Sequence, residues 1–330
     1  MIFLTSHLSP LISYLFPSPV NGVSPMDDTT SPFTQTARDL GFVAVGFLRP
    51  GRPPHLDAFL RWVRSGRRAD MAWLERNLEI REDPALLLPG CRTLVCLAWP
   101  YSDGKPCSPD GYTVSRYARP NRPDYHGELK SRCRVLVGEI ERRFPGARSR
   151  VCVDSAPILE RSFAQQAGIG FVGKNTLLIV PGVGSYVFLA EILTTAELPV
   201  PRAEPVESVC GDCSRCLDAC PTGALEAPYV LNASLCLSYR TIEWKGAVGP
   251  DEGRRMGNCF LGCDRCQEVC PLNPGVGAAD VSLPPVREFL EMEPQDFERD
   301  FGRTALSRPG LEKIRSNLRA LGVEKEETDR

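Results

Sequence analysis

Apolar and polar residues alternate in short blocks along the first two hundred positions, and most blocks have the period of one secondary-structure element. A Ser-Pro pair opens a predicted helix over residues 31–40, and Gly41 ends it. Apolar residues recur at helical spacing over residues 55–66. Two apolar runs, residues 42–47 and 93–99, are typical of strands, and the second has the composition of a fully buried one.

The same alternation continues further along the chain. Residues 129–144 carry apolar side chains at helical spacing before a Pro-Gly pair stops the pattern, and a second helix is predicted over residues 157–167. Apolar runs at 176–180 and 185–194 predict two strands around a Pro-Gly-Val-Gly turn. Helices that alternate with strands predict an α/β domain over residues 31–198.

A proline-containing linker is expected at residues 197–208, and a helical pattern returns over residues 286–321. Between them the chain is rich in cysteine, with nine of its 14 cysteines between positions 210 and 270. One run has the spacing C-x2-C-x2-C-x3-C-P, which is that of bacterial two-cluster ferredoxins, and a half-copy follows it. The run is Cys210, Cys213, Cys216, Cys220 and Pro221, and the half-copy is Cys263, Cys266, Cys270 and Pro271.

This spacing predicts two [4Fe-4S] clusters, because three closely spaced thiolates bind one cluster while the fourth points to its neighbour. We expect Cys210, Cys213, Cys216 and Cys270 on the first cluster, and Cys220, Cys263 and Cys266 on the second. The spacing leaves the eighth ligand open between Cys236 and Cys259, of which Cys259 is the less typical. A zinc ribbon would leave both C-P tails unexplained, and disulfides would need an oxidising compartment.

Charge and length exclude little. A net charge of −2 over 330 residues is compatible with nucleic acid binding, since arginines cluster locally. The three histidines show no metal-site spacing, and each is expected to be structural or exposed. The first 37 residues contain no Lys or Arg, so no secretory or twin-arginine signal is expected. We therefore expect a cytoplasmic protein with no membrane span, and residues 1–30 as a disordered extension, with Met26 an alternative start.

A glycine-rich stretch at residues 168–176 matches both a dinucleotide-binding motif and most of a phosphate loop. Asn175 stands where a phosphate loop needs Ser or Thr, and the predicted helix precedes the strands instead of following one. Nucleotide binding is therefore not expected here. What remains is a bend with Lys174 and Asn175 near Asp154. Asp154 is either the N-cap of the following helix or a general acid beside a redox centre.

Several stretches, taken together, resemble the epoxyqueuosine reductase family. They begin with Val153-Asp154-Ser155-Ala156-Pro157, Gly173-Lys174-Asn175-Thr176 and the cysteine run with Pro221-Thr222-Gly223-Ala224. Further stretches are Met71-Ala72-Trp73-Leu74 with Arg76-Asn77, Ser115-Arg116-Tyr117-Ala118, Asp124-Tyr125-His126, and Cys236-Leu237-Ser238-Tyr239 with Thr241-Ile242-Glu243. The resemblance covers residues 31–322.

The resemblance implies reduction of epoxyqueuosine to queuosine in the tRNA anticodon loop, with cobalamin and two [4Fe-4S] clusters as cofactors. It implies Asp154 as proton donor and Cys236 as the eighth cluster ligand. It also suggests corrinoid contacts at Asn77, Tyr117, Lys174, Asn175, Leu178 and Thr241. The expected architecture is an α/β cobalamin-binding domain (31–198), a ferredoxin-like domain (199–280) and a short C-terminal helical segment (281–330). An external electron donor and a monomeric state are also expected.

Two alternative functions stay open at this point. A corrinoid reductive dehalogenase shares the paired clusters, and a non-enzymatic electron-transfer module would need only the ferredoxin-like part. The chain departs from the family at Cys259, where a basic residue is more usual, so Cys259 is expected not to be a ligand.

Overall fold

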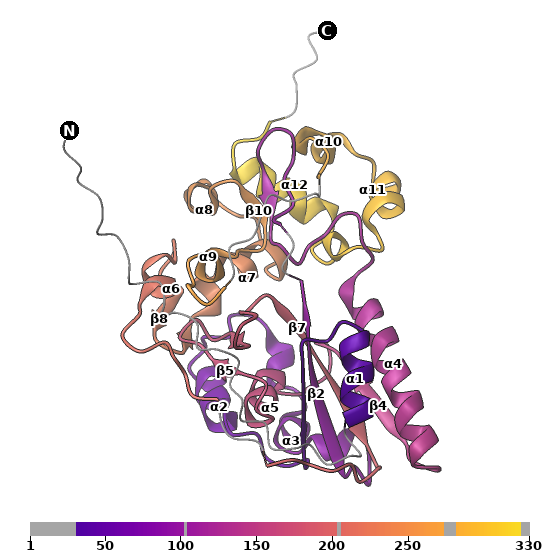
Figure 1. Cartoon of the computed structure of the whole chain (residues 1–330). Helices are drawn as coiled ribbons and strands as arrows, with labels where there is room; N and C mark the ends of the chain where they lie inside the picture. Colours follow the sequence, from indigo (N-terminus) through magenta and orange to yellow (C-terminus); the bar gives the residue numbers. More distant parts are fainter. Residues whose placement is uncertain (1–30, 102–103, 203–205, 274–281, 325–330) are drawn as a thin grey trace, which may run out of the picture.

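The computed structural model describes residues 31–101, 104–202, 206–273 and 282–324. The predicted N-terminal extension and the alternative start lie outside the described residues. Figure 1 shows a sheet with flanking helices in the lower part, the cysteine-rich segment above it, and the C-terminal helices at the top. None of the described helices is long and apolar enough to span a membrane.

The central sheet has four strands in the order β1-β2-β7-β4, and every neighbouring pair is antiparallel. The strands are β1 (Ala44–Leu48), β2 (Thr93–Pro100), β7 (Val187–Thr194) and β4 (Ser149–Cys152). The first six residues of β2 are buried, as its apolar run predicted. Helices and strands alternate along the chain and form a layered α/β structure. Such alternation often produces a parallel sheet, but the four strands of this central sheet are antiparallel.

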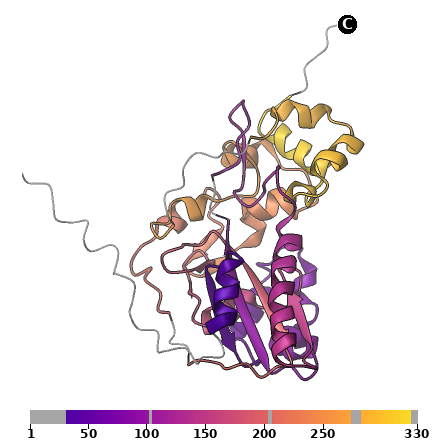
Figure 2. The ribbon, with the colours of Figure 1, turned by 45° about the vertical axis from the view of Figure 1, so that its right-hand side comes forward.

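Helices cover both faces of the sheet. On one face α1 (Ser31–Asp39) and α4 (Tyr125–Arg143) lie side by side, as Figure 2 shows, and pack with the sheet into one apolar core. On the other face α5 (Glu160–Gln166) packs against β2 and β7. The sheet is therefore enclosed between two helical layers. Its middle strands, β2 and β7, are the most buried part of this arrangement.

Shorter elements complete this part of the chain. They are α2 (Leu56–Arg64), η1 (Ala72–Glu75), α3 (Leu78–Glu82), η2 (Pro84–Leu87), β3 (Thr113–Val114), β5 (Phe171–Val172) and β6 (Leu178–Ile179).

Two predicted elements differ from the structure. The helix expected from residue 157 begins only at Glu160, because the chain makes a tight turn after β4 in which Asp154 has a φ of +53°. The strand expected over 176–180 is the two-residue β6, which pairs with β5 instead of joining β7. A Cβ on Gly170 would lie 2.2 Å from the Ile179 carbonyl oxygen, so this glycine is needed for close backbone packing.

The cysteine-rich segment folds into short pieces between cysteine pairs. Two one-turn helices, α6 (Arg215–Asp218) and α9 (Arg265–Glu268), follow the corresponding cysteines of the run and of its half-copy, and they lie against each other. The remaining elements are β8 (Leu225–Ala227), β9 (Val230–Leu231), η3 (Ala233–Leu235), α7 (Leu237–Ile242), α8 (Pro250–Met256) and β10 (Cys259–Leu261).

The helical pattern at the C-terminal end is confirmed as three helices with a short 3-10 turn between the second and third. They are α10 (Val286–Glu291), α11 (Pro294–Phe301), η4 (Ala305–Ser307) and α12 (Leu311–Ala320). These helices share one apolar core with β10 and with β3, which pair in parallel. The C-terminal helices thus cover the side of the cysteine-rich segment where β10 meets the first domain.

Asn317 connects α12 to this segment, and its contacts predict a measurable loss of stability on substitution. Its side chain is fully buried, and its amide donates to the carbonyl oxygens of Thr241 and Phe260, each at 2.9 Å. Asn317→Ala leaves both carbonyls without this donor, so we expect a loss of about 2 kcal/mol in unfolding free energy. Denaturant unfolding of the reconstituted protein measures it. Arg319→Ala, an exposed change on the same helix, is the control, and equal stability of both variants would contradict the prediction.

Candidate functional site

Asp154 stands at the turn between β4 and α5 in a left-handed backbone conformation, with φ of +53°. Its side chain is 57% exposed. The N-cap interpretation is wrong, because α5 begins six residues later and its N-cap position is Leu159. A non-glycine residue in this conformation carries backbone strain, and such strain concentrates at functional sites.

The carboxylate of Asp154 is held by two residues of the first turn of α4. The Tyr125 hydroxyl donates to Asp154 Oδ2 at 3.0 Å, and His126 Nε2 lies 3.1 Å from the same oxygen. The other ring nitrogen, His126 Nδ1, lies 2.6 Å from Oδ1 of Asp124, the N-cap residue of α4. The imidazole therefore stands between two carboxylates, an arrangement that the spacing of the histidines did not indicate.

This arrangement determines where the proton resides. Hydrogen bonds to Asp124 and then to Asp154 raise the pKa of His126 to about 9. The hydrogen bond from His126, followed by that from Tyr125, lowers the pKa of Asp154 even though burial acts in the opposite direction. At neutral pH the proton is thus on His126 and Asp154 is ionised. The proton that this site could donate is therefore bound to the imidazole, one hydrogen bond away from Asp154.

Aromatic stacking fixes the Tyr125 hydroxyl in place. The Tyr125 ring lies between the His126 ring, at a centroid distance of 4.2 Å, and the Phe188 ring, at 4.0 Å and nearly parallel. Tyr117 meets Tyr125 edge-on, with centroids 6.3 Å apart. Rings packed on both faces leave the phenol little freedom, so the hydroxyl stays directed at Asp154.

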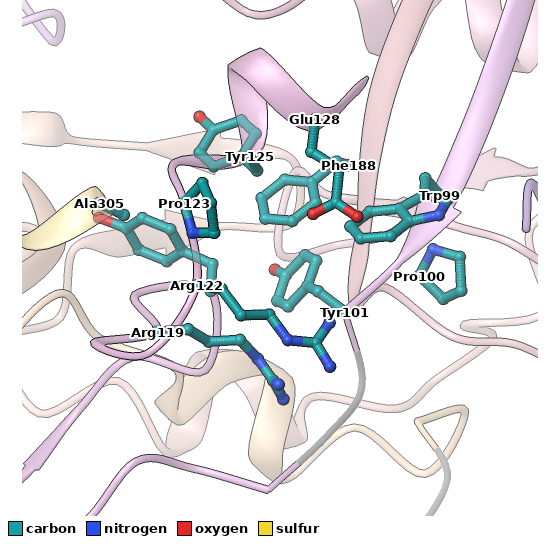
Figure 3. A pocket seen from close by; sticks show the side chains of 11 residues that line it. Trp99, Pro100, Tyr101, Arg119, Arg122, Pro123, Tyr125, Glu128, Phe188 and Ala305 are labelled. Atoms are coloured by element: carbon teal, nitrogen blue, oxygen red, sulfur yellow. The ribbon is translucent and has the colours of Figure 1, made fainter. Parts of the chain in front are cut away.

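A cavity of about 270 Å³ opens beside Tyr125. Figure 3 shows its aromatic walls, with the side chains of Arg119 and Arg122 next to each other at one end. Its lining residues are Trp99, Pro100, Tyr101, Tyr117, Arg119, Arg122, Pro123, Tyr125, Glu128, Phe188 and Ala305. Flat aromatic faces with guanidinium groups nearby suit an unpaired nucleic acid base attached to a phosphate.

The charges of the cysteine thiols act mainly within two groups, and Cys216 of the first group also acts on Cys266 of the second. Burial raises the pKa of Cys216, and the charges of Cys210 and Cys270 add to the shift. The charges of Cys210 and Cys213 act in the same way on Cys270. These four thiols form the first group.

The second group contains Cys236. Burial raises the pKa of Cys266, with further contributions from Cys263 and Cys236, and the charge of Cys220 acts on Cys236. No three of the Cys, His, Asp and Glu side chains in the described ranges converge closely enough to hold a single metal ion. Two groups of four thiols are the donor sets that two [4Fe-4S] clusters need, and the ligand assignment itself stays a prediction.

Cys259 acts on the pKa of Cys263 through its charge, but its own thiol makes its contacts with the backbone. It lies in β10, is only 6% exposed, and its thiol faces the carbonyl oxygens of Leu261 at 3.5 Å and Gly262 at 3.7 Å. All 14 cysteines lie in the described part of the chain, and each is a free thiol.

Two of the predicted corrinoid contacts join the first domain to the cysteine loops. The Lys174 ammonium donates to the carbonyl oxygens of Gly211 at 2.5 Å and Cys213 at 3.0 Å. The Asn175 amide, in a residue only 4% exposed, lies 3.5 Å from the Cys266 carbonyl oxygen. Lys174 thus holds the loop that carries Cys213 against the glycine-rich bend, and Asn175 contacts the loop that carries Cys266.

The other four predicted contacts are scattered. Tyr117 lines the aromatic cavity, and Asn77 is exposed in a left-handed conformation. Leu178 is 3% exposed within the core beneath the sheet. Thr241 is fully buried, and its hydroxyl donates to the Leu237 carbonyl and accepts from Gly262 N–H. The side chains of Leu178 and Thr241 have almost no surface to offer a ligand in this structure.

Comparison with known protein families gives two matches. Residues 81–155 match the family described as "Epoxyqueuosine reductase QueG, DUF1730". Residues 209–273 match the family described as "4Fe-4S double cluster binding domain". The first match ends just after Asp154, and the second includes every predicted cluster ligand.

Curated relatives share the same name. An epoxyqueuosine reductase of Pseudomonas aeruginosa is 40% identical over 242 residues, which are 72% of this chain and 66% of the relative. The matched region thus spans slightly less than two thirds of that protein. An epoxyqueuosine reductase of Leadbetterella byssophila is 32% identical over 305 residues, which are 89% of this chain and 98% of the relative.

Solved structures of epoxyqueuosine reductases are also similar to this chain in fold. One epoxyqueuosine reductase, in complex with an epoxyqueuosine-modified tRNA stem loop, aligns with a TM-score of 0.78 and 30% identity, covering 88% of this chain and 80% of that one. The Bacillus subtilis enzyme, in a structure with its aspartate-bearing catalytic loop swung out of the active site, aligns at 0.77 and 29% identity with the same coverage.

The position of His126 between two carboxylates predicts an unusual titration. By NMR its imidazole should titrate near pH 9. Because this pKa lies above the usual 6.5, protonated His126 stabilises the fold fully below pH 6.5, and the contribution is lost as pH rises through about 9. Asp124→Asn should lower the pKa most, since Asp124 is the largest cause of the shift. A titration near 6.5 in the unaltered protein would refute this picture.

The thiol groups predict different results for two neighbouring cysteines. Cys236→Ala should lose one cluster and about half of the iron, because Cys236 belongs to a group of four thiols. Cys259→Ala should retain both clusters, since its thiol faces backbone carbonyls. Iron analysis and electron paramagnetic resonance of the anaerobically reconstituted variants measure this. Full iron in Cys236→Ala, or loss of a cluster in Cys259→Ala, would require a different ligand set.

Proposed function

This chain belongs to the epoxyqueuosine reductase family, and we propose that it reduces epoxyqueuosine to queuosine in the anticodon loop of tRNA. The observation that carries the proposal is the proton-holding cluster of Asp124, His126 and Asp154, which stands beside an aromatic cavity that suits a nucleic acid base. A double-cluster domain adjoins the same region through Lys174 and Asn175. These contacts support the proposal that one molecule supplies both the proton and the electrons.

Two [4Fe-4S] clusters and cobalamin supply the electrons for cleavage of the carbon–oxygen bonds when they are bound. We propose Cys210, Cys213, Cys216 and Cys270 as ligands of one cluster and Cys220, Cys236, Cys263 and Cys266 as ligands of the other. Among the predicted corrinoid contacts, Asn77, Tyr117 and Lys174 keep accessible side-chain surface, and we retain these three for direct contact. An external protein donor would reduce the clusters of a monomeric enzyme.

The protein's own contribution to the chemistry is the proton. Removing the epoxide oxygen as water consumes two electrons and two protons. An expelled alkoxide is a poor leaving group, and a positioned proton donor accelerates such a step by about a hundredfold to ten-thousandfold. We propose that His126 holds the first proton and that Asp154 receives it through Oδ2 and passes it to the oxygen. Tyr125 keeps the carboxylate in position during this transfer.

The aromatic cavity accounts for recognition of the RNA. We propose that an unpaired base of the anticodon loop stacks against its aromatic walls while Arg119 and Arg122 approach the attached phosphate. Because Tyr125 lines the cavity and also contacts Asp154, a base bound there lies near the proton donor. Single-stranded loops are the parts of RNA in which bases can be reached in this way.

The function is tested with an anaerobic assay of the reconstituted protein, with cobalamin and a chemical reductant, on tRNA that carries epoxyqueuosine. The product is digested to nucleosides and analysed by mass spectrometry. A nucleoside that is lighter by one oxygen, formed only with cobalamin, supports the proposal. No conversion by a protein that retains both clusters and bound cobalamin would refute it.

The proton-holding cluster predicts separate effects for its two members. Asp154→Ala should keep iron and cobalamin but lose at least about a hundredfold in turnover, because the route to the oxygen is removed. We expect the unaltered enzyme to lose rate as pH rises through about 9, and His126→Gln should lower turnover and abolish this loss. The pH dependence of kcat measures the second effect. Normal turnover in Asp154→Ala would remove this residue from the acid role.

A further inference from the structure

A buried carboxyl lies in the middle of the sheet, and the proposed reaction does not use it. Glu191 belongs to β7, where its neighbours across the sheet are Cys96 of β2 and Cys152 of β4. It is fully buried, and no residue that carries a positive charge bears on its pKa. Burying a carboxyl without a positively charged partner costs free energy, so Glu191 lowers the stability of the fold. This cost suggests that the residue has another role.

The group that meets Glu191 is a second carboxyl, that of Glu160 at the first position of α5. Burial and the charge of Glu160 keep the pKa of Glu191 well above its usual value. Burial is also the main cause that raises the pKa of Glu160, to about 7. The packing of α5 against β7 brings these two side chains together, and neither oxygen of Glu191 has a hydrogen-bond donor among the described residues. Two such groups cannot both be ionised, so at least one proton stays on the pair.

The carboxyl group of Glu160 also contacts the backbone of Asp154, the proposed catalytic residue. Its Oε1 accepts the N–H of Asp154 at 2.7 Å. Within the turn itself the described backbone contacts are local, from Ser155 N–H to the Val153 carbonyl and from Ile158 N–H to the Ala156 carbonyl. Tyr125 and His126 hold the side chain of Asp154, whereas Glu160 holds its left-handed backbone.

We propose that Glu160 and Glu191 form a buried carboxyl latch that positions Asp154 by holding residues 153–159 against the active site. Glu191, neutral in the core, directs the carboxyl of Glu160 toward the Asp154 N–H. Both are positioning residues, since neither reaches the reacting atoms. This proposal rests on the proposed role of Asp154. In one structure of the Bacillus subtilis enzyme the aspartate-bearing catalytic loop lies outside the active site, so such a loop can leave its place in that protein.

The latch makes a prediction that a purely structural role does not. Replacing a buried carboxyl by an apolar residue of similar size removes its desolvation cost, so Glu191→Leu should leave the melting temperature unchanged or raise it. The same variant should lose the loop position, because Glu160 no longer has its partner. We expect hydrogen exchange over residues 153–159 to accelerate about tenfold and kcat to fall about tenfold, with KM for tRNA within about twofold.

Two further variants complete the experiment on the cluster-loaded, cobalamin-bound protein. Glu191→Gln keeps a neutral donor toward Glu160 and should restore exchange and kcat to within about threefold of the unaltered enzyme. Glu197→Gln changes an exposed carboxyl just beyond the same strand and should change none of the three measurements. Glu160→Ala removes the acceptor itself and should resemble Glu191→Leu in loop exchange.

The outcomes separate the latch from the proposed function. Slow exchange over residues 153–159 and normal kcat in Glu191→Leu would overturn the latch. Equal losses of melting temperature and kcat in the Leu and Gln variants would also overturn it, because they would indicate a packing role alone. If the unaltered protein does not convert epoxyqueuosine, the proposed function fails, and the exchange measurement alone decides whether the latch exists.

Discussion

His126 lies between the carboxylates of Asp124 and Asp154, and this contact joins two separate segments, the start of α4 and the loop after β4. Asp124 is the N-cap of α4, so the start of the longest helix is fixed by the same carboxylate that orients the imidazole. Asp154 lies near the start of the loop after β4, and its left-handed backbone brings the carboxylate to the imidazole. Tyr125, between them in the sequence, forms a wall of the aromatic cavity. Protonated His126 donates Nδ1–H to Asp124 and Nε2–H to Asp154, which is why its pKa is raised while theirs are lowered.

Several contacts hold the cysteine-rich segment against the first part of the chain. The Lys174 ammonium binds the carbonyls of the first cysteine loop, and the glycine-rich bend that carries it packs closely because Gly170 has no side chain. On the opposite side, β10 of the cysteine-rich segment pairs with β3 of the first domain, and the C-terminal helices cover the joint. These contacts fix the cysteine loops relative to Asp154. Electrons and protons that must meet at one substrate need such a fixed relation.

Several features of the site cost stability. Asp154 has a left-handed backbone, and Glu191 places a carboxyl in the centre of an otherwise apolar sheet. Both lie on one path, from β7 through Glu160 to the backbone of Asp154. Proteins accept such local conflicts where activity needs a precise position, and the rest of the core compensates. The well-packed layers on either side of the sheet provide that compensation, with Val95 and Ile192 fully buried on one face and Leu94 and Leu193 on the other.

The sequence by itself determined the features that depend on local spacing. Cysteine intervals indicate the cluster type because ligands on one short loop bind one cluster, and apolar periodicity located most helices and strands because the period follows from the element. Tertiary structure alone decided the rest. Strand direction depends on how distant segments pair, and the role of His126 depends on Asp154, 28 positions later. Glu191 lies within an apolar run that predicts an ordinary strand, and only its burial against Glu160 distinguishes it. The proton state of such groups arises from long-range burial and neighbouring charges, which residue type and spacing do not encode.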